Sequence, residues 1–488
     1  MESIFKKVRK TLKLIAEKNN MTLWNSEDVQ TATCGVSVNS WEAGGVSIDS
    51  RKIESGDLFI ALVGDNNDGH KYVKSALAKG AVAAVVNYVP DDMDDRDNLL
   101  IVDNTFDALW DMARYSRDRM KGKVIMVTGS VGKTTTKEML AHVLEHQGKV
   151  HATIGNLNNH YGLPLTLARM PADTDYALLE VGMSSAGEIS PLSVLTQPDS
   201  VIITNVEPVH LEFFDSIEGI AKAKAEVFDG LKEGGCAVLN YDNLNFPYLQ
   251  KIADEKNIKN IKTFGKSSNA AFRLDKYEET VDNAKIIASL DGSEVQYELG
   301  IFGEHHALNS LGVLALVKSV GANLERAADA FADFEAKAGR GKRMCIEGKF
   351  GNITLIDDTY NASPAAVSAS LKVLGDIKAK YKNRIVAVLG DMFELGDDAI
   401  KMHEELSTKI IENNVDVVFT AGKLTKSLYN RLPDEIKGNH KDDSSEIAIS
   451  VYNCLKDGDV VLVKGSRGMK MENVVNYICN DKGMKNAI

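Results

Sequence analysis

The run from Val124 to Thr136, Val-Ile-Met-Val-Thr-Gly-Ser-Val-Gly-Lys-Thr-Thr-Thr, constrains the fold of this chain more than any other segment. Its apolar, β-branched first half predicts a buried strand that ends at Thr128. A short glycine loop follows, and an amphipathic stretch over 137–147 predicts a helix. A strand, a glycine loop and a helix in this order bind phosphate, because loop N–H groups and the positive end of the helix dipole converge on an anion.

The loop departs from the full phosphate-loop pattern, which wants glycine where this chain has Val127. The alternative reading is a glycine turn that precedes a helix by chance. The strand before the loop and the helix after it favour nucleotide binding, with Lys133 at the outer phosphates and the Thr134 hydroxyl on Mg²⁺. The predicted nucleotide-binding residues of this segment are Gly129, Ser130, Val131, Gly132, Lys133, Thr134 and Thr135.

Length and composition narrow the remaining possibilities. A chain of 488 residues predicts about three domains. A net charge of −12 argues against nucleic acid as a general partner. Five scattered cysteines without a C-x-x-C pair indicate reduced thiols and a cytoplasmic location. No apolar run approaches the ~20 residues of a membrane span, so we expect no stable membrane insertion; the basic amphipathic stretch over 4–15 is interpreted as a domain's first helix rather than a membrane-surface helix.

Alternating strand and helix signals divide the chain into three blocks, 1–118, 119–337 and 338–488. The boundaries are marked by Arg119-Met-Lys-Gly122 and by the glycine-rich basic segment Lys337-Ala-Gly-Arg-Gly-Lys-Arg343. This alternation predicts an α/β protein with mostly parallel sheets and right-handed crossovers. We expect a smaller N-terminal α/β domain, a central phosphate-loop domain and a C-terminal Rossmann-like domain. Strands are predicted at 46–49, 57–62, 81–86, 124–128, 200–204, 236–240, 353–357, 385–389, 415–419 and 460–463, with a hairpin over 284–299 that turns at Asp291-Gly292.

Polar residues follow several of the predicted strands, at the sheet edge where ligands of α/β proteins bind. Glu180 follows one strand, Thr204-Asn205 ends another with His210 soon after, Asp357-Asp358 ends a third, and Lys464-Gly-Ser-Arg467 ends a fourth. Each cluster alone is a weak signal, because a strand-end acid is often a helix cap. Together with one phosphate loop they indicate an active site.

These clusters belong to longer motifs spread over nearly the whole chain. With them the chain resembles the Mur ligases, the ATP-dependent amide-forming enzymes of peptidoglycan synthesis. The third-block motifs are typical of members that add D-alanyl-D-alanine, and they read differently in ligases that add the third residue and in folylpolyglutamate synthases. The motifs are Ile48-Asp-Ser-Arg51, Asp68-Gly-His70, Thr128-Gly-Ser-Val-Gly-Lys-Thr-Thr135, Gly155-Asn-Leu-Asn-Asn159, Glu180-Val-Gly182, Lys224-Ala-Glu226, Gly303-Glu-His305, Ile356-Asp-Asp-Thr-Tyr-Asn-Ala-Ser-Pro364, Val388-Leu-Gly-Asp-Met392 and Lys464-Gly-Ser-Arg467.

The resemblance implies a ligase that uses ATP and Mg²⁺ to join D-alanyl-D-alanine to UDP-N-acetylmuramoyl-tripeptide. The tripeptide carboxylate would attack the γ-phosphate of ATP, and the dipeptide amine would then displace phosphate from the acyl phosphate. A related ligase that adds another amino acid, a phosphoryl-transfer enzyme and a non-catalytic nucleotide-sugar-binding protein are the alternatives. The sequence leaves open whether the tripeptide ends in lysine or diaminopimelate, and we expect a monomer.

The resemblance also implies roles for residues of the central block. Lys133 would neutralise phosphate charge, and Mg²⁺ would bind Thr134 and Glu180. His210 would lie at a second Mg²⁺, together with Lys224 as a carbamate. From the residues alone, Lys224 reads as a lysine on a helix surface.

Nucleotide and substrate contacts are implied for all three blocks. Asn309, His305 and Asp357 would hold adenine and ribose. An arginine would meet the γ-phosphate, and the choice between Arg340 and Arg343 stays open, although the spacing to Asp357 favours Arg343.

The remaining substrate contacts follow from the same resemblance. The uridine diphosphate would bind Ser50 and Arg51, and the sugar-peptide would contact Asn158 and Asn159. Tyr360 and Asn361 would lie near the dipeptide, or else form a turn that packs the third domain. Because the site is divided among three blocks, domain closure on binding is expected.

Overall fold

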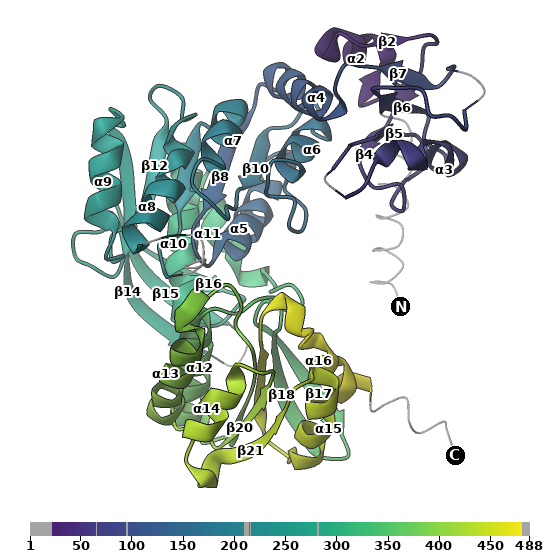
Figure 1. Ribbon diagram of the computed structural model, residues 1–488. Helices are drawn as coiled ribbons and strands as arrows, with labels where there is room; N and C mark the ends of the chain where they lie inside the picture. The colour runs from purple at the N-terminus through teal and green to yellow at the C-terminus, as the bar shows by residue number, and fades with distance from the viewer. Residues whose placement is uncertain are drawn as a thin grey trace, which may run out of the picture.

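The structure is a computed structural model that describes residues 22–64, 66–93, 96–208, 214, 216–280 and 283–480. The described residues form three large sheets and one two-stranded ribbon, and each large sheet is built from one continuous stretch of sequence. Figure 1 shows the three sheet domains in sequence order, the first at the upper right, the second at the upper left and the third below the second. The predicted α/β class with three domains is confirmed. The predicted helix over 4–15 lies outside the described residues.

The first domain holds a five-stranded sheet in which four neighbouring strands run parallel and β2 is antiparallel at one edge. The strands predicted for this domain are present, and their side chains Leu58, Ile60 and Val85 are fully buried. The sheet order is β2 (Val36–Ser37), β7 (Leu99–Ile101), β6 (Ala83–Val86), β5 (Asp57–Ile60) and β4 (Gly45–Ser47), with helices α2 (Ser26–Thr33) and α3 (Val73–Ala78) and a small ribbon of β1 (Trp24–Asn25) and β3 (Glu42–Ala43).

Helix α4 (Thr105–Arg119) joins the first domain to the second and contributes to the cores of both. Leu109 and Met112 pack into the first domain's core, which also takes in Leu165 and Ala168 of α6 (Gly162–Ala168). Ala113, the residue after Met112 on α4, packs into the core of the central domain. The first two domains therefore share apolar packing across their boundary.

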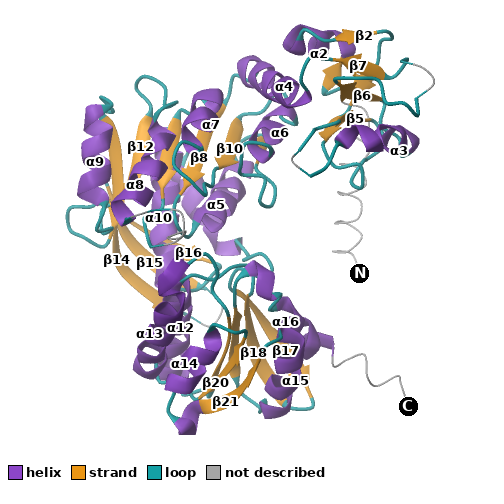
Figure 2. Cartoon of the chain, in the orientation of Figure 1, coloured by secondary structure: helices purple, strands orange, loops and turns teal. Residues whose placement is uncertain are grey.

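The central domain is a nine-stranded sheet with helices on both faces (Figure 2). One face is covered by α5, α10 and α11, and the other by α6, α7, α8 and α9. The strand order is β16 (Ser293–Leu299), β15 (Ala284–Leu290), β14 (Phe272–Glu279), β13 (Asn260–Gly265), β12 (Cys236–Asn240), β11 (Ser200–Ile203), β8 (Lys123–Thr128), β10 (Tyr176–Glu180) and β9 (Val150–Ala152), and the helices are α5 (Lys133–Glu145), α7 (Ile189–Thr196), α8 (Ile217–Ala225), α9 (Phe246–Glu255), α10 (Glu304–Ser319) and α11 (Leu324–Ala330).

The central sheet is parallel from β9 to β14 and becomes antiparallel at β15 and β16. The predicted hairpin is confirmed, because Asp291 and Gly292 have φ of +48° and +88°, the left-handed pair that a tight two-residue turn requires. The far end of the β14–β15 pair extends toward the third domain (Figure 1).

The third domain is a six-stranded sheet with a doubly wound arrangement of helices. Strand β22 lies between β18 and β19 in the sheet. Helix α12, which follows β18, and helix α16, which follows β22, pack on opposite faces of the sheet. Among described residues, its two apolar cores contain only positions after 343. The strand order is β17 (Lys342–Gly348), β18 (Gly351–Asp358), β22 (Val460–Lys464), β19 (Ile385–Gly390), β20 (Val417–Ala421) and β21 (Lys437–Lys441), and the helices are α12 (Pro364–Tyr381), α13 (Ala399–Glu412), α14 (Thr425–Arg431), α15 (Ser444–Cys454) and α16 (Glu472–Cys479).

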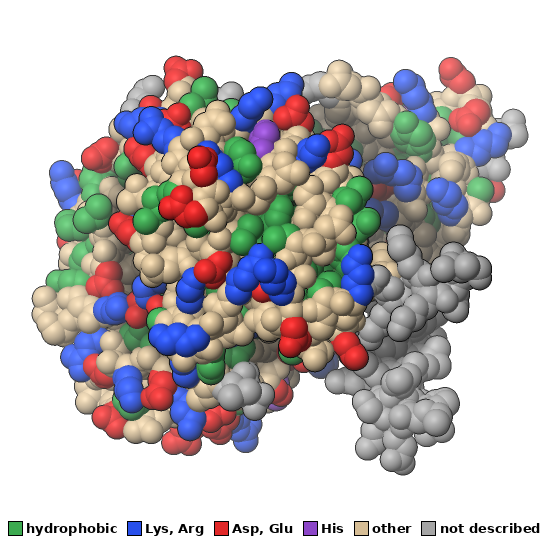
Figure 3. Space-filling model, turned by 90° about the horizontal axis from the view of Figure 1, so that it is seen from below, with side chains coloured by type: hydrophobic (Ala, Val, Ile, Leu, Met, Phe, Trp, Pro, Cys, Tyr) green, Lys and Arg blue, Asp and Glu red, His purple; other side chains and the backbone are tan. Residues whose placement is uncertain are grey.

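Acidic and basic side chains are interspersed on the face seen from below the view of Figure 1 (Figure 3). Among the helices in the described ranges, none is long and apolar enough to cross a membrane.

Candidate active site

The phosphate loop leaves β8 at Gly129 and enters α5 at Lys133. Gly129 and Gly132 have φ of +146° and +83°, which other residues rarely adopt. A Cβ at Gly129 would lie 1.9 Å from the Thr204 hydroxyl oxygen, and one at Gly132 would lie 3.0 Å from the amide nitrogen of Asn309. Both glycines are therefore required, because the loop is packed between the end of β11 and helix α10.

The end of β11 holds the loop through several hydrogen bonds. The Thr204 hydroxyl donates to the Val131 carbonyl at 2.6 Å, and the Val131 N–H donates to the Asn205 side chain at 3.0 Å. The Ser130 hydroxyl donates to the carbonyl of Glu207 at 3.0 Å and accepts the N–H of Glu207 at 2.9 Å. The predicted strand-end pair Thr204-Asn205 thus fixes the shape of the loop.

Lys133 begins α5, and its ammonium lies over the loop backbone. It donates to the Gly129 carbonyl at 2.6 Å and to the Ser130 carbonyl at 3.4 Å. Burial lowers the pKa of Lys133, the charge of Arg340 lowers it further, and the Glu180 carboxylate opposes both. The lysine therefore lies within electrostatic reach of an acid from β10 and an arginine from the domain linker.

Glu180 ends β10 beside the loop and has an oxygen available for a cation. Its Oε1 accepts from the Asn158 amide at 3.1 Å. Its Oε2 is buried and has no hydrogen-bond partner among the described residues. An orphaned carboxylate oxygen of a residue that lines the same cavity as Thr134 of α5 suits a hard cation such as Mg²⁺. The predicted ligand His210 lies outside the described residues.

Lys224 is buried on α8 rather than exposed on a helix surface, with 2% of its side chain accessible. Burial, together with the charge of Lys133, lowers the pKa of Lys224 well below its ordinary value. Within the described parts of the chain its ammonium has no hydrogen bond or ion pair. The reading from sequence pattern alone, a solvated lysine, does not fit this burial.

A cavity of about 680 Å³ lies between the central and third domains. Most of the described residues that line it come from the phosphate loop, from α10 and α12, from the linker, from the ends of β10 and β11, and from the loops that follow β18, β19 and β22. Of the predicted site residues, it is lined by Ser130, Val131, Gly132, Lys133, Thr134, Thr135, Asn158, Glu180, His305, Asn309, Arg340, Arg343, Tyr360 and Asn361.

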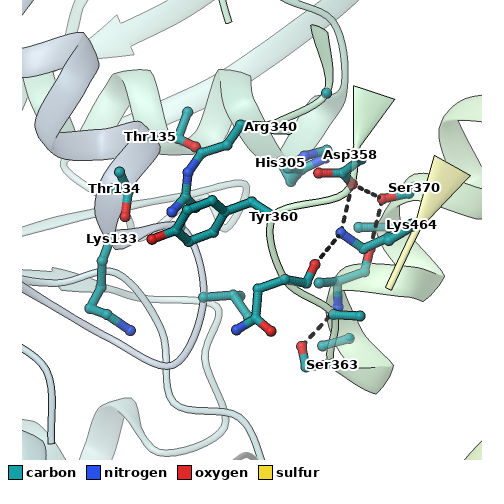
Figure 4. A pocket seen from close by; sticks show the side chains of 18 of the residues that line it. Lys133, Thr134, Thr135, His305, Arg340, Asp358, Tyr360, Ser363, Ser370 and Lys464 are labelled. Atoms are coloured by element: carbon teal, nitrogen blue, oxygen red, sulfur yellow. Dashed lines mark hydrogen bonds and ion pairs between the residues drawn. The ribbon is translucent and has the colours of Figure 1, made fainter. Parts of the chain in front are cut away.

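The two acids at the end of β18 have different roles, because neighbouring strand residues face opposite ways. One oxygen of Asp357 accepts the N–H of Gly339 in the linker at 2.8 Å, and the other accepts the Thr359 hydroxyl in the loop after β18 at 2.7 Å. Asp358 faces the cavity, where it accepts from Lys464 at 2.6 Å and Ser370 at 2.8 Å (Figure 4). The geometry thus favours Asp358 over the predicted Asp357 as a ligand-contacting acid.

The two candidate arginines both line the cavity but lie in different surroundings. The guanidinium of Arg340 lies 3.9 Å from the ring centre of Tyr360, close to the first turn of α5 (Figure 4). Arg343 lies 3.6 Å from the ring centre of Phe302 and forms an ion pair with Glu279 at 3.3 Å. Arg340 therefore faces the phosphate loop, whereas Arg343 is held by a carboxylate behind the cavity wall.

Helix α10 brings His305, His306 and Asn309 to the cavity from its first two turns. Burial lowers the pKa of His305 to about 4 and that of His306 well below its ordinary value, so both rings are neutral near pH 7. The Nδ1 of His306 is buried and has no hydrogen-bond partner in the described chain. A neutral ring with an open nitrogen can serve a nucleotide hydroxyl or amine.

The predicted uridine site lies apart from this cavity, which has no described lining residue before Ser130. Arg51 pairs with Asp49 through two bonds of 2.9 Å, and 84% of its side chain is exposed. Ser50 accepts a lysine ammonium through its carbonyl at 2.8 Å. The Asn159 side chain accepts the N–H of Gly162 at the start of α6 and so has a structural use.

Family profiles match all three domains of the chain. The profile of the Mur ligase family catalytic domain matches residues 42–108, that of the Mur ligase middle domain 127–317, and that of the Mur ligase glutamate ligase domain 342–467. A UDP-N-acetylmuramoyl-tripeptide–D-alanyl-D-alanine ligase of Rickettsia prowazekii is 36% identical over 456 residues, which cover 93% of this chain and 99% of the relative. The chain belongs to the Mur ligase family. The Bacillus subtilis ligase of the same description is 34% identical over 96% of this chain and 98% of its own length.

Solved Mur ligase structures share the whole architecture. MurF from Acinetobacter baumannii superposes with a TM-score of 0.82 at 27% identity, over 94% of this chain and 99% of that one. MurF ligase from Thermotoga maritima, in complex with ADP, superposes with a TM-score of 0.76 at 28% identity, over 90% and 98%. The predicted Mur ligase resemblance is confirmed.

The structure adds pocket residues to which the sequence gives no specific role. Asp358 and Lys464 belong to strand-end clusters that indicate an active site without a stated function, and Ser370 has no sequence signal, because its role depends on the start of α12 facing the cavity. Phe302 and His306 adjoin predicted residues on the chain. The helical period of α10 could have signalled His306, since it lies three residues from Asn309 on the same helix face.

Proposed function

We propose that this Mur ligase family member joins D-alanyl-D-alanine to UDP-N-acetylmuramoyl-tripeptide with the hydrolysis of ATP to ADP and phosphate. One observation carries the proposal: a phosphate loop opens into an interdomain cavity in a chain whose near full-length relatives bear this description. Peptidoglycan precursor synthesis is the corresponding role. A cytoplasmic location and a monomeric state belong to the same proposal.

The chemistry needs a carboxylate to approach a phosphate, so positive charge must gather at one point. The carboxylate oxygen bonds to the γ-phosphorus as the bond to ADP breaks. The dipeptide nitrogen then bonds to the carbonyl carbon, phosphate leaves, and the amine loses a proton. Lys133 and Arg340 face that point from the two domains, and Arg343 forms the adjoining wall.

Thr134 and Glu180 are the described residues that would hold Mg²⁺, and the orphaned Glu180 oxygen fits that use. When bound, the cation would screen phosphate charge and orient the oxygens. We further propose that Asn309, His305 and Asp358 bind the nucleoside, with Asp357 acting on the linker instead.

Lys224 is proposed to carry a carbamate. Burial lowers the pKa of Lys224 and so favours its neutral amine, and a neutral amine reacts with CO₂ with release of a proton. The product is a carboxylate-like group that suits a hard cation and balances the charge of Lys133. Lys224→Ala should lose most phosphate release and recover part of it with added short carboxylic acids. Parental activity of Lys224→Ala without an additive would contradict this role.

The other substrates are assigned to the two outer domains. We propose that residues 1–118 bind the uridine diphosphate end through Ser50 and Arg51, that 119–337 bind ATP, and that 338–488 bind the dipeptide. The loop with Tyr360 and Asn361 lies at the carboxyl ends of β18 and β22, beside the point where the helices diverge to opposite faces. Ligands of doubly wound sheets bind at such a point.

The decisive experiment measures phosphate release with ATP and UDP-N-acetylmuramoyl-tripeptide. Three acceptor conditions are compared: D-alanyl-D-alanine, single amino acids and no acceptor. Release that depends on the dipeptide, with the ligated product identified by mass spectrometry, supports the proposal. Equal release in all three conditions, or ligation of single amino acids only, overturns it. Lysine-containing and diaminopimelate-containing tripeptides in parallel define the third residue.

A further inference from the structure

The end of β14 forms a second junction between the central and third domains, apart from the linker. Glu279 closes this strand, and 10% of its side chain is exposed. Its carboxylate accepts the Tyr277 hydroxyl at 2.6 Å and a guanidinium N–H of Arg343 at 3.3 Å. Its backbone carbonyl accepts the ammonium of Lys380, at the end of α12. One residue of the central domain thus contacts two elements of the third.

The same hydrogen-bond network reaches the start of the helix that lines the nucleotide cavity. The Tyr277 hydroxyl accepts the N–H of Gly303 at 2.5 Å while it donates to Glu279. Gly303 has φ of +110°, and a Cβ there would lie 2.7 Å from the ring of His305. Gly303 precedes α10 directly, so this network fixes where the helix begins and where its first histidine lies.

Arg343 is held by two neighbouring side chains and also lines the cavity. The Phe302 ring lies against one face of its guanidinium, and Glu279 binds its edge. Arg343 and Phe302 line the cavity, but Glu279 is not among the lining residues. A mostly buried guanidinium depends on its counter-charge, and without Glu279 it would turn or draw in water.

We propose that Glu279 is a positioning residue for the ligase reaction. It holds Arg343 in the cavity wall and, through Tyr277, holds the start of α10 at a fixed place relative to that arginine. The nucleotide surfaces contributed by the two domains therefore keep their spacing. This inference rests on the proposed function, since it assigns Glu279 to the nucleotide side of the same site.

The test compares Glu279→Gln with Glu278→Gln. Glu278 is the adjacent residue on β14, and its side chain is exposed and pairs with Lys276 at 3.0 Å. Glu279→Gln keeps the shape and removes the charge, so ADP affinity by calorimetry should fall about tenfold and KM for ATP should rise similarly, as for loss of a charged hydrogen bond. Glu278→Gln should match the parent. Binding of UDP-N-acetylmuramoyl-tripeptide should be the same in all three proteins.

A double variant distinguishes a Glu279 that positions Arg343 from a Glu279 that only holds the two domains together. If Glu279 acts through Arg343, the variant Glu279→Gln/Arg343→Ala should bind ADP no more weakly than Arg343→Ala alone. The inference would be overturned if the losses of ADP affinity in the two single variants multiplied in the double variant. It would also be overturned if Glu279→Gln and Glu278→Gln bound ADP equally well. A fall in thermal midpoint with unchanged nucleotide affinity would overturn it as well. ADP calorimetry needs no turnover, so a parent that fails to ligate the dipeptide would refute the proposed function without deciding the Glu279 comparison.

Discussion

The phosphate loop and the Ser50–Arg51 segment are both predicted to bind phosphate groups, but they are built differently. The loop is fixed by the end of β11 and by α10, and its two glycines leave no room for a side chain. The Ser50–Arg51 segment is held by a local pair between Arg51 and Asp49, with most of the arginine in solvent. The phosphate loop is therefore shaped before its ligand arrives, whereas the proposed uridine segment has one long side chain that would have to be redirected. Pre-organisation lowers the cost of binding, so the two sites should respond differently to substitution.

The largest expected effect is the loss of Lys133. Lys133→Ala removes the ammonium nearest the loop carbonyls, and phosphate release should fall by about 10²–10³-fold or more. Affinity for UDP-N-acetylmuramoyl-tripeptide, measured by calorimetry, should stay at the parental value because the first domain is untouched. Lys251→Ala on α9, a side chain that is 72% exposed, is the matched control. A folded Lys133→Ala variant with near-parental turnover would show that the loop is not the reacting site.

A second prediction tests the rigidity of the loop with two glycines. Gly129→Ala places a Cβ against the Thr204 hydroxyl, whereas Gly155→Ala has a φ of +60° but nothing within 4 Å. Both variants carry backbone strain, and only the first also carries a clash, which costs about 1–3 kcal/mol. ADP affinity should therefore fall about 10–100-fold for Gly129→Ala and stay close to parental for Gly155→Ala. Equal losses would mean that general strain, not the packed loop, sets affinity.

The third prediction concerns the opposite side of the comparison. Arg51→Ala should weaken UDP-N-acetylmuramoyl-tripeptide binding about tenfold, the usual effect of losing one charged hydrogen bond, and should leave ADP affinity unchanged. Arg114→Ala on α4 removes another exposed arginine, paired with Asp111 at 2.7 Å, and serves as the control. If Arg51→Ala binds the sugar nucleotide as the parent does, the uridine assignment for this segment is refuted.

The smallest expected effect is that His305 and Asp49, one in each region, change the stability of the protein over different pH ranges. Burial lowers the pKa of His305 to about 4 from 6.5, and the hydrogen bond from Arg51 lowers the pKa of Asp49 to about 2 from 3.8. In both cases the unfolded chain binds the proton more tightly, so stability falls with acid: between pH 6.5 and 4 for His305, and between pH 4 and 2 for Asp49. Urea unfolding across pH 7 to 4 should show a shallower loss of stability in His305→Asn, about 1.4 kcal/mol less for each pH unit at most.

The control for the pH series is Asp49→Asn, which should follow the parent above pH 4. An unchanged slope for His305→Asn in the upper window would show that the ring is not held neutral by burial. A shallower slope for Asp49→Asn in that window would show that the first-domain carboxylate does not titrate where its surroundings imply.

Sequence pattern predicted the elements better than the orientation of side chains. The strand over 124–128 and the turn at Asp291-Gly292 are encoded by neighbours in the chain, so local rules suffice for them. Asp357 and Asp358 are two adjacent aspartates, and only the register of β18 against β22 decides which one faces the cavity. Sequence could not resolve that register.

Long-range packing accounts for the other differences. Lys224 lies two residues from Lys222 and from Glu226 in the sequence, and its burial follows from how α8 lies against the sheet. Glu279 lies 64 residues before Arg343, in another domain, so no local motif joins them. The burial of Lys224 depends on packing within the central domain, and the Glu279–Arg343 contact depends on packing between two domains, so neither follows from local sequence.

The shared packing of α4 has a consequence for the order in which the domains unfold. Its apolar side chains fill two cores at once, so the first domain cannot melt without exposing part of the second. The third domain's described cores draw on no residue before 344. Calorimetric heating should therefore show two cooperative transitions for three domains, and a limited protease should cut within 337–341 before it releases a fragment ending near 118.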